Sequence, residues 1–139
     1  MVGIVIVTHD DLAKQLLETA KKIVGEATQA TTLSITVNKE VEQTRNELLQ
    51  AILSVDTGHG VLILTDMFGG TPSNISLSFL NEKNIEVLTG VNLPMLIKLL
   101  SLTVRDDLHA LAKQIEIYGK NNIYLASDIL SHKGKINKE

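Results

Sequence analysis

The sequence predicts an α/β fold, a mostly parallel sheet with helices on both of its faces. Short apolar runs alternate along the chain with longer stretches in which apolar residues recur at helical spacing. The first run, Val2 to Val7, is apolar at nearly every position, which is typical of a strand buried on both faces. Strand–helix–strand units of this kind pack as right-handed crossovers within a single sheet.

The first half of the chain is expected to form three strands joined by two helices. In order, these are a strand from Val2 to Val7, a helix from Asp10 or Asp11 to Val24, a strand from Thr31 to Val37, a helix from Glu40 to Val55 and a strand from Val61 to Asp66. Either Asp10 or Asp11 is expected to cap the first helix, because Asp is favoured at helix starts. Gly25 is the expected C-cap, because glycine adopts the left-handed conformation that ends many helices.

The second half is expected to add two strands and three helices. These are a helix from Pro72 to Leu80, a strand from Ile85 to Leu88, helices from Leu93 to Ser101 and from Asp106 to Tyr118, and a last strand from Ile123 to Ser127. Pro72 suits the first position of a helix, where its missing N–H is not needed. We expect one domain over residues 1–130, followed by a polar tail over residues 131–139.

The composition narrows the class of protein. A chain of 139 residues with 44% hydrophobic and 21% charged residues is typical of one soluble globular domain. The net charge of −3 and the 3% aromatic content argue against a nucleic-acid-binding surface. With no cysteine, the chain has no disulfides, thiolate zinc sites or cysteine nucleophiles. The first apolar run is too short for a signal peptide or a membrane span, so a cytoplasmic location is expected.

Three polar segments follow strands and should therefore meet at the carboxyl edge of the sheet, where open α/β sheets bind their ligands. They are the segment around His9, the segment from Asp66 to Ser73, and the segment from Thr89 to Pro94. An imidazole is a good nucleophile near neutral pH. Its second ring nitrogen needs an acceptor that fixes the tautomer, and Asp66 is the natural candidate.

The residues after Asp66 are suited to bind an anion. Gly69 and Gly70 allow the backbone to approach an anion closely and to point N–H groups at it. Thr71 and Ser73 add hydroxyl donors, and a helix that starts at this point directs its positive end to the same place. Phosphoryl transfer requires mainly positioning and charge stabilisation, so these groups supply a site for it without a metal or another cofactor.

These residues make the chain similar to a known family, the enzyme IIA components of the mannose-type bacterial phosphotransferase system. The resemblance covers nearly the whole chain and is carried by three segments, Gly3 to His9, Gly60 to Asn74 and Gly90 to Leu96. It implies a histidine phosphocarrier that serves sugar uptake or phosphorylation-dependent signalling.

The resemblance also implies roles for particular residues. His9 would accept a phosphoryl group on its Nε2 atom from the phosphocarrier protein HPr and pass it to a histidine of a IIB component, which serves a membrane sugar permease. Asp66 would orient the ring, and Thr71 with the glycine loop would contact the phosphoryl group. We expect partner proteins to contact three residues near this edge, Phe68, Asn92 and Pro94.

The family forms dimers in which a C-terminal strand can be exchanged, and Ile123 to Ser127 is the segment that would do so here. One departure from the family concerns the residue after the active histidine, which is commonly Gly and here is Asp10, followed by Asp11. The added negative charge should disfavour a phosphoryl group on His9 or alter partner recognition, although a helix N-terminus would offset part of this cost.

Three alternatives remain open. A receiver domain would place acids after the first strand (Asp10 and Asp11), a phospho-acceptor after the third (Asp66) and a hydroxyl after the fourth (Thr89). The glycine loop and the missing lysine after a fifth parallel strand argue against it. A metal-dependent hydrolase would use His9, Asp10 and Asp66 around a cation, although this is an incomplete set of ligands. Within the resemblance, the chain could instead relay phosphate to a dihydroxyacetone kinase.

The other histidines are not expected to take part in the chemistry. His59 lies in a turn before the third strand, at the opposite edge of the sheet from His9. His109 lies within a helix, on its polar face, and His132 lies in the tail.

Overall fold

Four parallel strands form the sheet of the computed structural model, which describes residues 1–26, 29–82 and 84–131. The strand order is β2-β1-β3-β4, and every neighbouring pair is parallel. In chain order the elements are β1 (Gly3–His9), α1 (Leu12–Val24), β2 (Ala30–Ile35), α2 (Val41–Val55), β3 (Val61–Thr65), α3 (Thr71–Leu77), β4 (Ile85–Thr89), α4 (Leu93–Ser101) and α5 (Leu108–Asn121).

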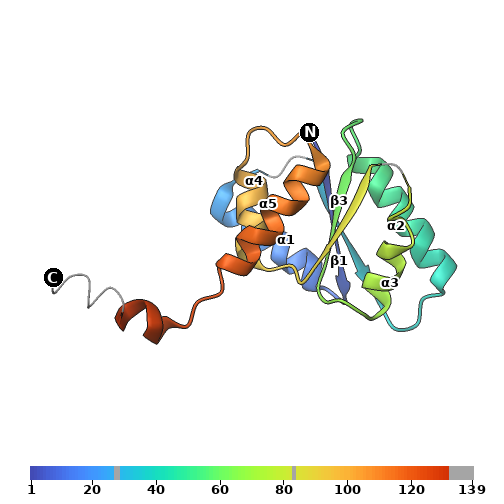
Figure 1. Ribbon diagram of the computed structural model, residues 1–139. Helices are drawn as coiled ribbons and strands as arrows, with labels where there is room; N and C mark the ends of the chain where they lie inside the picture. Colours follow the sequence, from blue (N-terminus) through green and yellow to red (C-terminus); the bar gives the residue numbers. More distant parts are fainter. Residues whose placement is uncertain (27–28, 83, 132–139) are drawn as a thin grey trace.

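Helices cover both faces of this sheet, as the sequence predicts. Figure 1 shows α1, α4 and α5 on one side of the strands, and α2 and α3 on the other. The side chains of β1 alternate between the two cores. Ile4 and Ile6 pack towards α1, α4 and α5, whereas Val5 and Val7 pack towards α2 and α3. All four are fully buried, which explains why this strand is apolar at nearly every position.

The start of α1 differs in one respect from the prediction. Asp11 occupies the N-cap position, but its side chain makes no capping hydrogen bond. The hydroxyl of Thr8 accepts a hydrogen bond from the Ala13 N–H at 2.7 Å and donates one to the His9 carbonyl at 3.1 Å. Thr8 is fully buried, so the capping oxygen comes from the end of the strand and fixes the backbone between β1 and α1.

The strand predicted from Ile123 to Ser127 is absent from the described residues. Residues 123–125 form no regular element, and residues 126–131 form a short helix. Figure 1 shows this segment leading away from the sheet beyond α5, so it lies beside no strand that could pair with its backbone. Without a neighbouring strand, the backbone N–H and C=O groups of an apolar run have no partners with which to form a β-sheet. The expected polar tail lies, apart from Ser131, outside the described residues.

The strand order determines where a ligand can bind. From β1 the chain moves outward in one direction to β2, and it then returns to place β3 on the other side of β1. The connections on either side of the β1–β3 boundary therefore run to opposite faces of the sheet. This boundary is the topological switch point, where open α/β sheets have a crevice at the carboxyl ends of their strands.

Candidate functional site

His9 and Asp66 meet at the switch point between β1 and β3. His9 is the last residue of β1, and Asp66 directly follows β3. The register pairs Val7 of β1 with Thr65 of β3, so the backbone leaves these two strands at neighbouring points of the sheet edge. The structure thus brings together the two residues that the sequence predicts as the catalytic pair.

The carboxylate of Asp66 holds His9 by both its ring and its backbone. Its Oδ2 atom lies 2.8 Å from His9 Nδ1 and accepts the His9 backbone N–H at 3.0 Å. Its Oδ1 atom accepts the Met67 N–H at 3.0 Å. With Nδ1 donating to the carboxylate, the lone pair of the neutral imidazole is on Nε2. Because the His9 side chain is 49% exposed and that of Asp66 only 13% exposed, the imidazole is open to an incoming group while the carboxylate that holds it is covered.

The environment of Asp66 favours the carboxylate form. Burial acts to raise the pKa of its carboxyl group, but the hydrogen bonds from the His9 ring and backbone, and the charge that His9 can carry, act in the opposite direction. The net effect is a pKa below the ordinary value of an aspartate. Asp66 therefore stays negative and can stabilise positive charge that develops on the ring.

This lowered pKa predicts a pH dependence of stability. A carboxyl group with a pKa lower in the folded state than in the unfolded chain stabilises the fold above its unfolded pKa, about 3.9. That contribution is lost as the pH falls through the folded value. We expect the free energy of unfolding of the wild type to fall more steeply below pH 4 than that of Asp66→Asn, as measured by urea denaturation. Parallel profiles for the two proteins would contradict the assignment. The exposed Glu116, whose pKa is also lowered, is present in both proteins and cancels.

Gly70 borders the open nitrogen of His9. A Cβ atom built on Gly70 would lie 3.3 Å from His9 Nε2 and 3.2 Å from Cε1. The backbone of Gly70 also has a φ of +83°, which disfavours other residues. A glycine at this position therefore leaves room beside Nε2, and α3 begins directly after it.

The other predicted phosphoryl-binding residues differ in accessibility. Thr71 is exposed and lines the same cavity as His9, and Gly69 is half-buried with open space around its Cα. Ser73 is fully buried, and its Oγ atom has no hydrogen-bond partner among the described residues. Direct contact of Ser73 with a phosphoryl group would require its side chain or α3 to move.

The cavity in front of His9 includes a loop that the sequence analysis did not single out. Its volume is about 420 Å³. Its lining residues come from the ends of β1 and β2, the residues that follow these strands, and the starts of α2 and α3; they are His9, Asp10, Ile35, Thr36, Val37, Lys39, Val41 and Thr71. β2 is the other neighbour of β1, and the Asp10 N–H donates to the Ile35 carbonyl at 3.0 Å. The sequence did contain one sign that this loop could reach the site, because the predicted second strand also ends at the carboxyl edge of the sheet. It did not show which strands lie next to β1.

Asp10 lies at the mouth of this cavity in an uncommon backbone conformation. Its φ is +47°, in the left-handed region that Gly adopts easily and that Asp tolerates better than most residues. This geometry explains why the resemblance would place Gly at this position. The substitution adds a carboxylate beside His9 and leaves the turn between β1 and α1 in place.

The third predicted segment reaches the same edge but lines a different cavity. Thr89, Gly90 and Asn92 border a cavity of about 250 Å³ between β4 and α5 that does not include His9. The side chain of Asn92 caps α4 by accepting the Met95 N–H at 3.0 Å and donates to the Gly119 carbonyl at 3.2 Å. Its amide is therefore engaged within the chain.

The remaining residues predicted to bind partners are Phe68 and Pro94. Phe68 is 75% exposed and lies on the loop that follows Asp66, whereas Pro94 is half-buried in the first turn of α4. Partner binding by Phe68, Asn92 and Pro94 stays a prediction.

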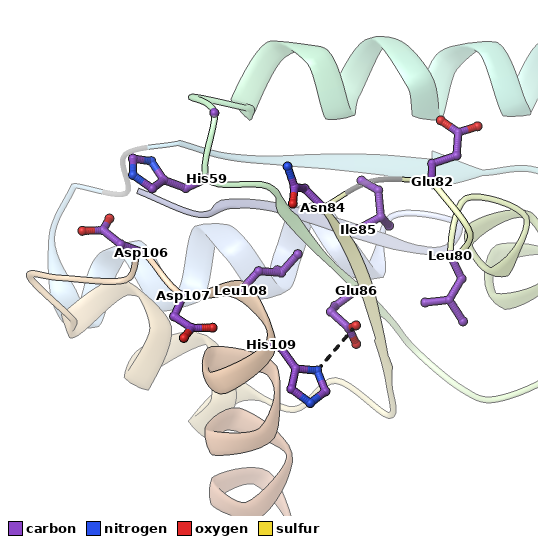
Figure 2. A pocket seen from close by; sticks show the side chains of 11 residues that line it. His59, Leu80, Glu82, Asn84, Ile85, Glu86, Asp106, Asp107, Leu108 and His109 are labelled. Carbon is purple, nitrogen blue, oxygen red and sulfur yellow. Dashed lines mark ion pairs between the residues drawn. The ribbon is translucent and has the colours of Figure 1, made fainter.

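A larger cavity lies at the opposite edge of the sheet, away from His9. Figure 2 shows its lining, which includes His59, Glu86 and His109, and its volume is about 640 Å³. His109 Nδ1 lies 3.7 Å from Glu86 Oε1, and His59 Nδ1 lies 3.1 Å from the N-terminal amine of Met1. Both histidines are exposed, which confirms the predicted turn position of His59 at the opposite edge from His9 and the predicted position of His109 on the exposed face of a helix. The structure adds that His109 also lies on this far side.

The described residues offer neither a cluster of metal ligands nor a membrane-spanning helix. Within residues 1–26, 29–82 and 84–131, no three histidine, aspartate or glutamate side chains come together in a group able to hold a metal ion. Over the same ranges, no helix is both long and apolar enough to cross a bilayer.

Comparisons with known proteins identify the family. The family model of the PTS system fructose IIA component matches residues 3–116. The fructose-specific EIIA component of the phosphotransferase system (PTS) of Bacillus subtilis (strain 168) is 29% identical over 131 residues, which cover 94% of this chain and 90% of that protein. The mannose-specific EIIAB component of Escherichia coli (strain K12) is 36% identical over 107 residues, or 76% of this chain. The matched region spans about a third (32%) of the E. coli protein.

Solved structures agree with the sequence matches. A PTS component EIIA from Streptococcus agalactiae superposes with a TM-score of 0.82 at 25% identity, covering 92% of this chain and 99% of that one. The PTS IIA protein associated with the fucose utilization operon of Streptococcus pneumoniae superposes with a TM-score of 0.77 at 27% identity, covering 94% and 99%. None of these matches favours the receiver or the metal-hydrolase interpretation. The chain therefore belongs to the mannose/fructose-type enzyme IIA family of the bacterial phosphotransferase system, whose members are phosphotransferases that accept a phosphoryl group on a histidine and pass it on.

Proposed function

We propose that His9 is the phosphoryl-accepting residue of this enzyme IIA and that the group is carried on Nε2. The observation that supports this most directly is the 2.8 Å contact between His9 Nδ1 and Asp66 Oδ2. With Nδ1 donating in this contact, the lone pair of the neutral ring is on Nε2, next to the space left by the missing Cβ of Gly70.

The transfer step follows from this geometry. The Nε2 lone pair attacks the phosphorus of the phosphohistidine on HPr, a P–N bond to His9 forms, and the P–N bond to the donor histidine breaks. The Nδ1 proton stays on the ring, and Asp66 stabilises the positive charge that develops there. Donation to a histidine of a IIB component is the reverse of this step with a different acceptor. No proton enters or leaves His9, which suits a site whose task is positioning.

We assign partner docking to an apolar rim around the cavity, formed by Val37, Val41, Met67 and Phe68. All four are more than half exposed, Val37 at 96%. Val37 and Val41 line the cavity, and Met67 and Phe68 follow Asp66. Exposed apolar side chains near a reactive group suit brief contact with two successive partners, HPr and IIB, because burial of apolar area is not specific to one of them.

The wider pathway is also part of the proposal. Related proteins are named for fructose, mannose and sorbose, so we infer a sugar of this group as the final phosphoryl acceptor and a membrane permease as the indirect partner of this chain. We also infer a location in the cytoplasm, where the phosphoryl donor HPr would reach the protein.

The test is phosphorylation of the purified protein by phosphoenolpyruvate, enzyme I and HPr, followed by mapping of the modified residue. We expect one acid-labile phosphate, on His9. An acid-stable, hydroxylamine-labile phosphate on Asp66 would contradict the proposal and support a receiver domain. Transfer from His9 to a dihydroxyacetone kinase subunit, with none to any IIB protein, would leave His9 in place and change the acceptor.

We also propose that the chain forms a homodimer through its C-terminal segment, residues 123–131. Ile123, Leu125 and Leu130 in this segment are each about two-thirds exposed or more, and the outer edge of β4 carries no further strand among the described residues. Light scattering should give twice the chain mass of 15.2 kDa. The double variant Ile123→Asp, Leu125→Asp should lower it to one chain, whereas the control Leu53→Asp, an exposed position on α2, should not. A monomeric wild type would refute this part.

A further inference from the structure

The cavity in front of His9 contains one side chain that can supply a full positive charge. Of the described residues that line it, Lys39 is the only lysine or arginine. Lys39 lies on the β2–α2 loop, in a turn in which its N–H donates to the Thr36 carbonyl at 3.4 Å. The loop is joined to the His9 segment by the hydrogen bond between the Asp10 N–H and the Ile35 carbonyl.

Phosphorylation of His9 would concentrate negative charge at this place. A phosphoryl group on a side chain carries roughly −1.5 to −2 charge at pH 7. The carboxylate of Asp66 lies on the other side of the ring, and its pKa is lowered, so it is ionised. Asp10 adds a third anionic group to the wall of the same cavity. Helix α3 has only seven residues, so its backbone supplies partial charge only.

Lys39 is held in the unphosphorylated protein by a neighbour that it can leave. Its Nζ atom lies 2.8 Å from Glu47 Oε2, and the two side chains are 33% and 31% exposed. An ion pair in contact with water is weak, and the lysine stem is long and flexible. A phosphoryl group with up to two charges and three acceptor oxygens is a stronger partner for an ammonium group than one carboxylate.

We infer that Lys39 is a phosphoryl-binding residue of this chain, which exchanges its ion pair with Glu47 for one with the phosphoryl group on His9. The inference rests on the proposed function, because it requires a phosphate on His9. Lys39 compensates for the charge that Asp10 adds, and it explains how the site tolerates a carboxylate next to its nucleophile. No covalent bond to Lys39 forms, and the transfer between the two histidines is unchanged.

The test is the equilibrium of phosphoryl transfer between HPr and this protein, measured for four variants. Lys39→Met should shift the equilibrium towards phospho-HPr by about 10-fold or more, because a charge-assisted hydrogen bond to the phosphoryl group is lost. Lys39→Arg should restore most of the wild-type value. Glu47→Gln should shift the equilibrium the other way by about 2-fold, because it releases Lys39 from a surface ion pair. Lys113→Met, which removes a lysine on α5 that pairs with Glu116, should change nothing.

A second measurement separates charge from structure. In a ³¹P NMR titration, the last ionisation of the phosphoryl group on His9 should move to higher pH in Lys39→Met, because loss of the ammonium charge disfavours the dianion. Both Lys39→Met and Glu47→Gln break the same ion pair, so a structural role of that pair would shift the equilibrium in the same direction in both. Shifts in the same direction, or none in Lys39→Met, would overturn the inference and leave His9 as the acceptor. No acid-labile phosphate on His9 in the wild type would overturn both proposals.

Discussion

Replacing His9 by alanine is expected to abolish phosphoryl acceptance while leaving the protein folded. The ring supplies the nucleophilic Nε2 atom, and no other nitrogen of the described residues combines an anchored tautomer with an open position beside Gly70. Because the side chain is about half exposed, its removal leaves no cavity in the core. Asp66 keeps its hydrogen bonds to the backbone N–H groups of residue 9 and Met67, so the loss of stability should be about 1 kcal/mol or less.

The measurement is incorporation of labelled phosphate from phosphoenolpyruvate through enzyme I and HPr, with circular dichroism and urea denaturation to confirm the fold. The matched controls are His59→Ala and His109→Ala, which remove exposed histidines at the opposite edge of the sheet and should accept phosphate as the wild type does. Incorporation into His9→Ala at the wild-type level would show that another residue is the acceptor. Loss of incorporation in a control instead would identify that histidine.

Replacing Asp66 by asparagine should slow the transfer from HPr to His9 by about 100-fold or more, with little change in the affinity for HPr. The carboxylate accepts three N–H groups, from His9 Nδ1, the His9 backbone and Met67. An asparagine amide has only one acceptor oxygen, so each of its two orientations sets its NH₂ group against at least one donor. If the NH₂ group faces the ring, it donates to Nδ1 and forces the proton onto Nε2, which then has no lone pair to attack phosphorus.

Rapid-quench kinetics with labelled phospho-HPr would measure this rate. The matched control is Asp10→Asn, the same chemical change at a carboxylate that lines the cavity but makes no hydrogen bond or ion pair with the ring. Its transfer rate should not fall, because only negative charge near the incoming phosphoryl group is removed. Equal rates for Asp66→Asn and the wild type would remove Asp66 from the mechanism. Equal slowing in both Asn variants would assign the effect to charge in the cavity and not to orientation of the ring.

The local parts of this site were predictable because they depend on short-range chemistry. The buried strand before His9, the glycine-containing start of α3 and the helix that ends at Gly25 were identified from patterns of apolar residues and from the backbone preferences of Gly and Pro. The pairing of His9 with Asp66 was also anticipated, since both follow apolar runs. The strand and helix features require information from only a few neighbouring residues. The His9–Asp66 pair joins residues 57 positions apart and follows instead from the rule that ligands bind at the carboxyl ends of the strands.

The errors arose where a residue's role depends on how the elements are oriented and packed in three dimensions. The cap of α1 comes from Thr8 and not from an aspartate side chain, because the turn between β1 and α1 directs the buried hydroxyl at the helix. The strand expected from Ile123 to Ser127 is missing, because a strand needs a neighbour and apolar residues alone do not supply one. The burial of Ser73 depends on how α3 packs against the sheet.

The sequence by itself determined the fold class, the candidate pair of His9 and Asp66 and the family resemblance, because each follows from residue types and from polar residues at the ends of apolar strands. Only the tertiary structure decided that β1 lies between β2 and β3. That order places Asp66 on one side of His9 and the loop with Lys39 on the other, and it separates both from the segment around Asn92. Strand order is fixed by the packing of helices on both faces of the sheet, a sum of many long-range contacts that no local pattern contains.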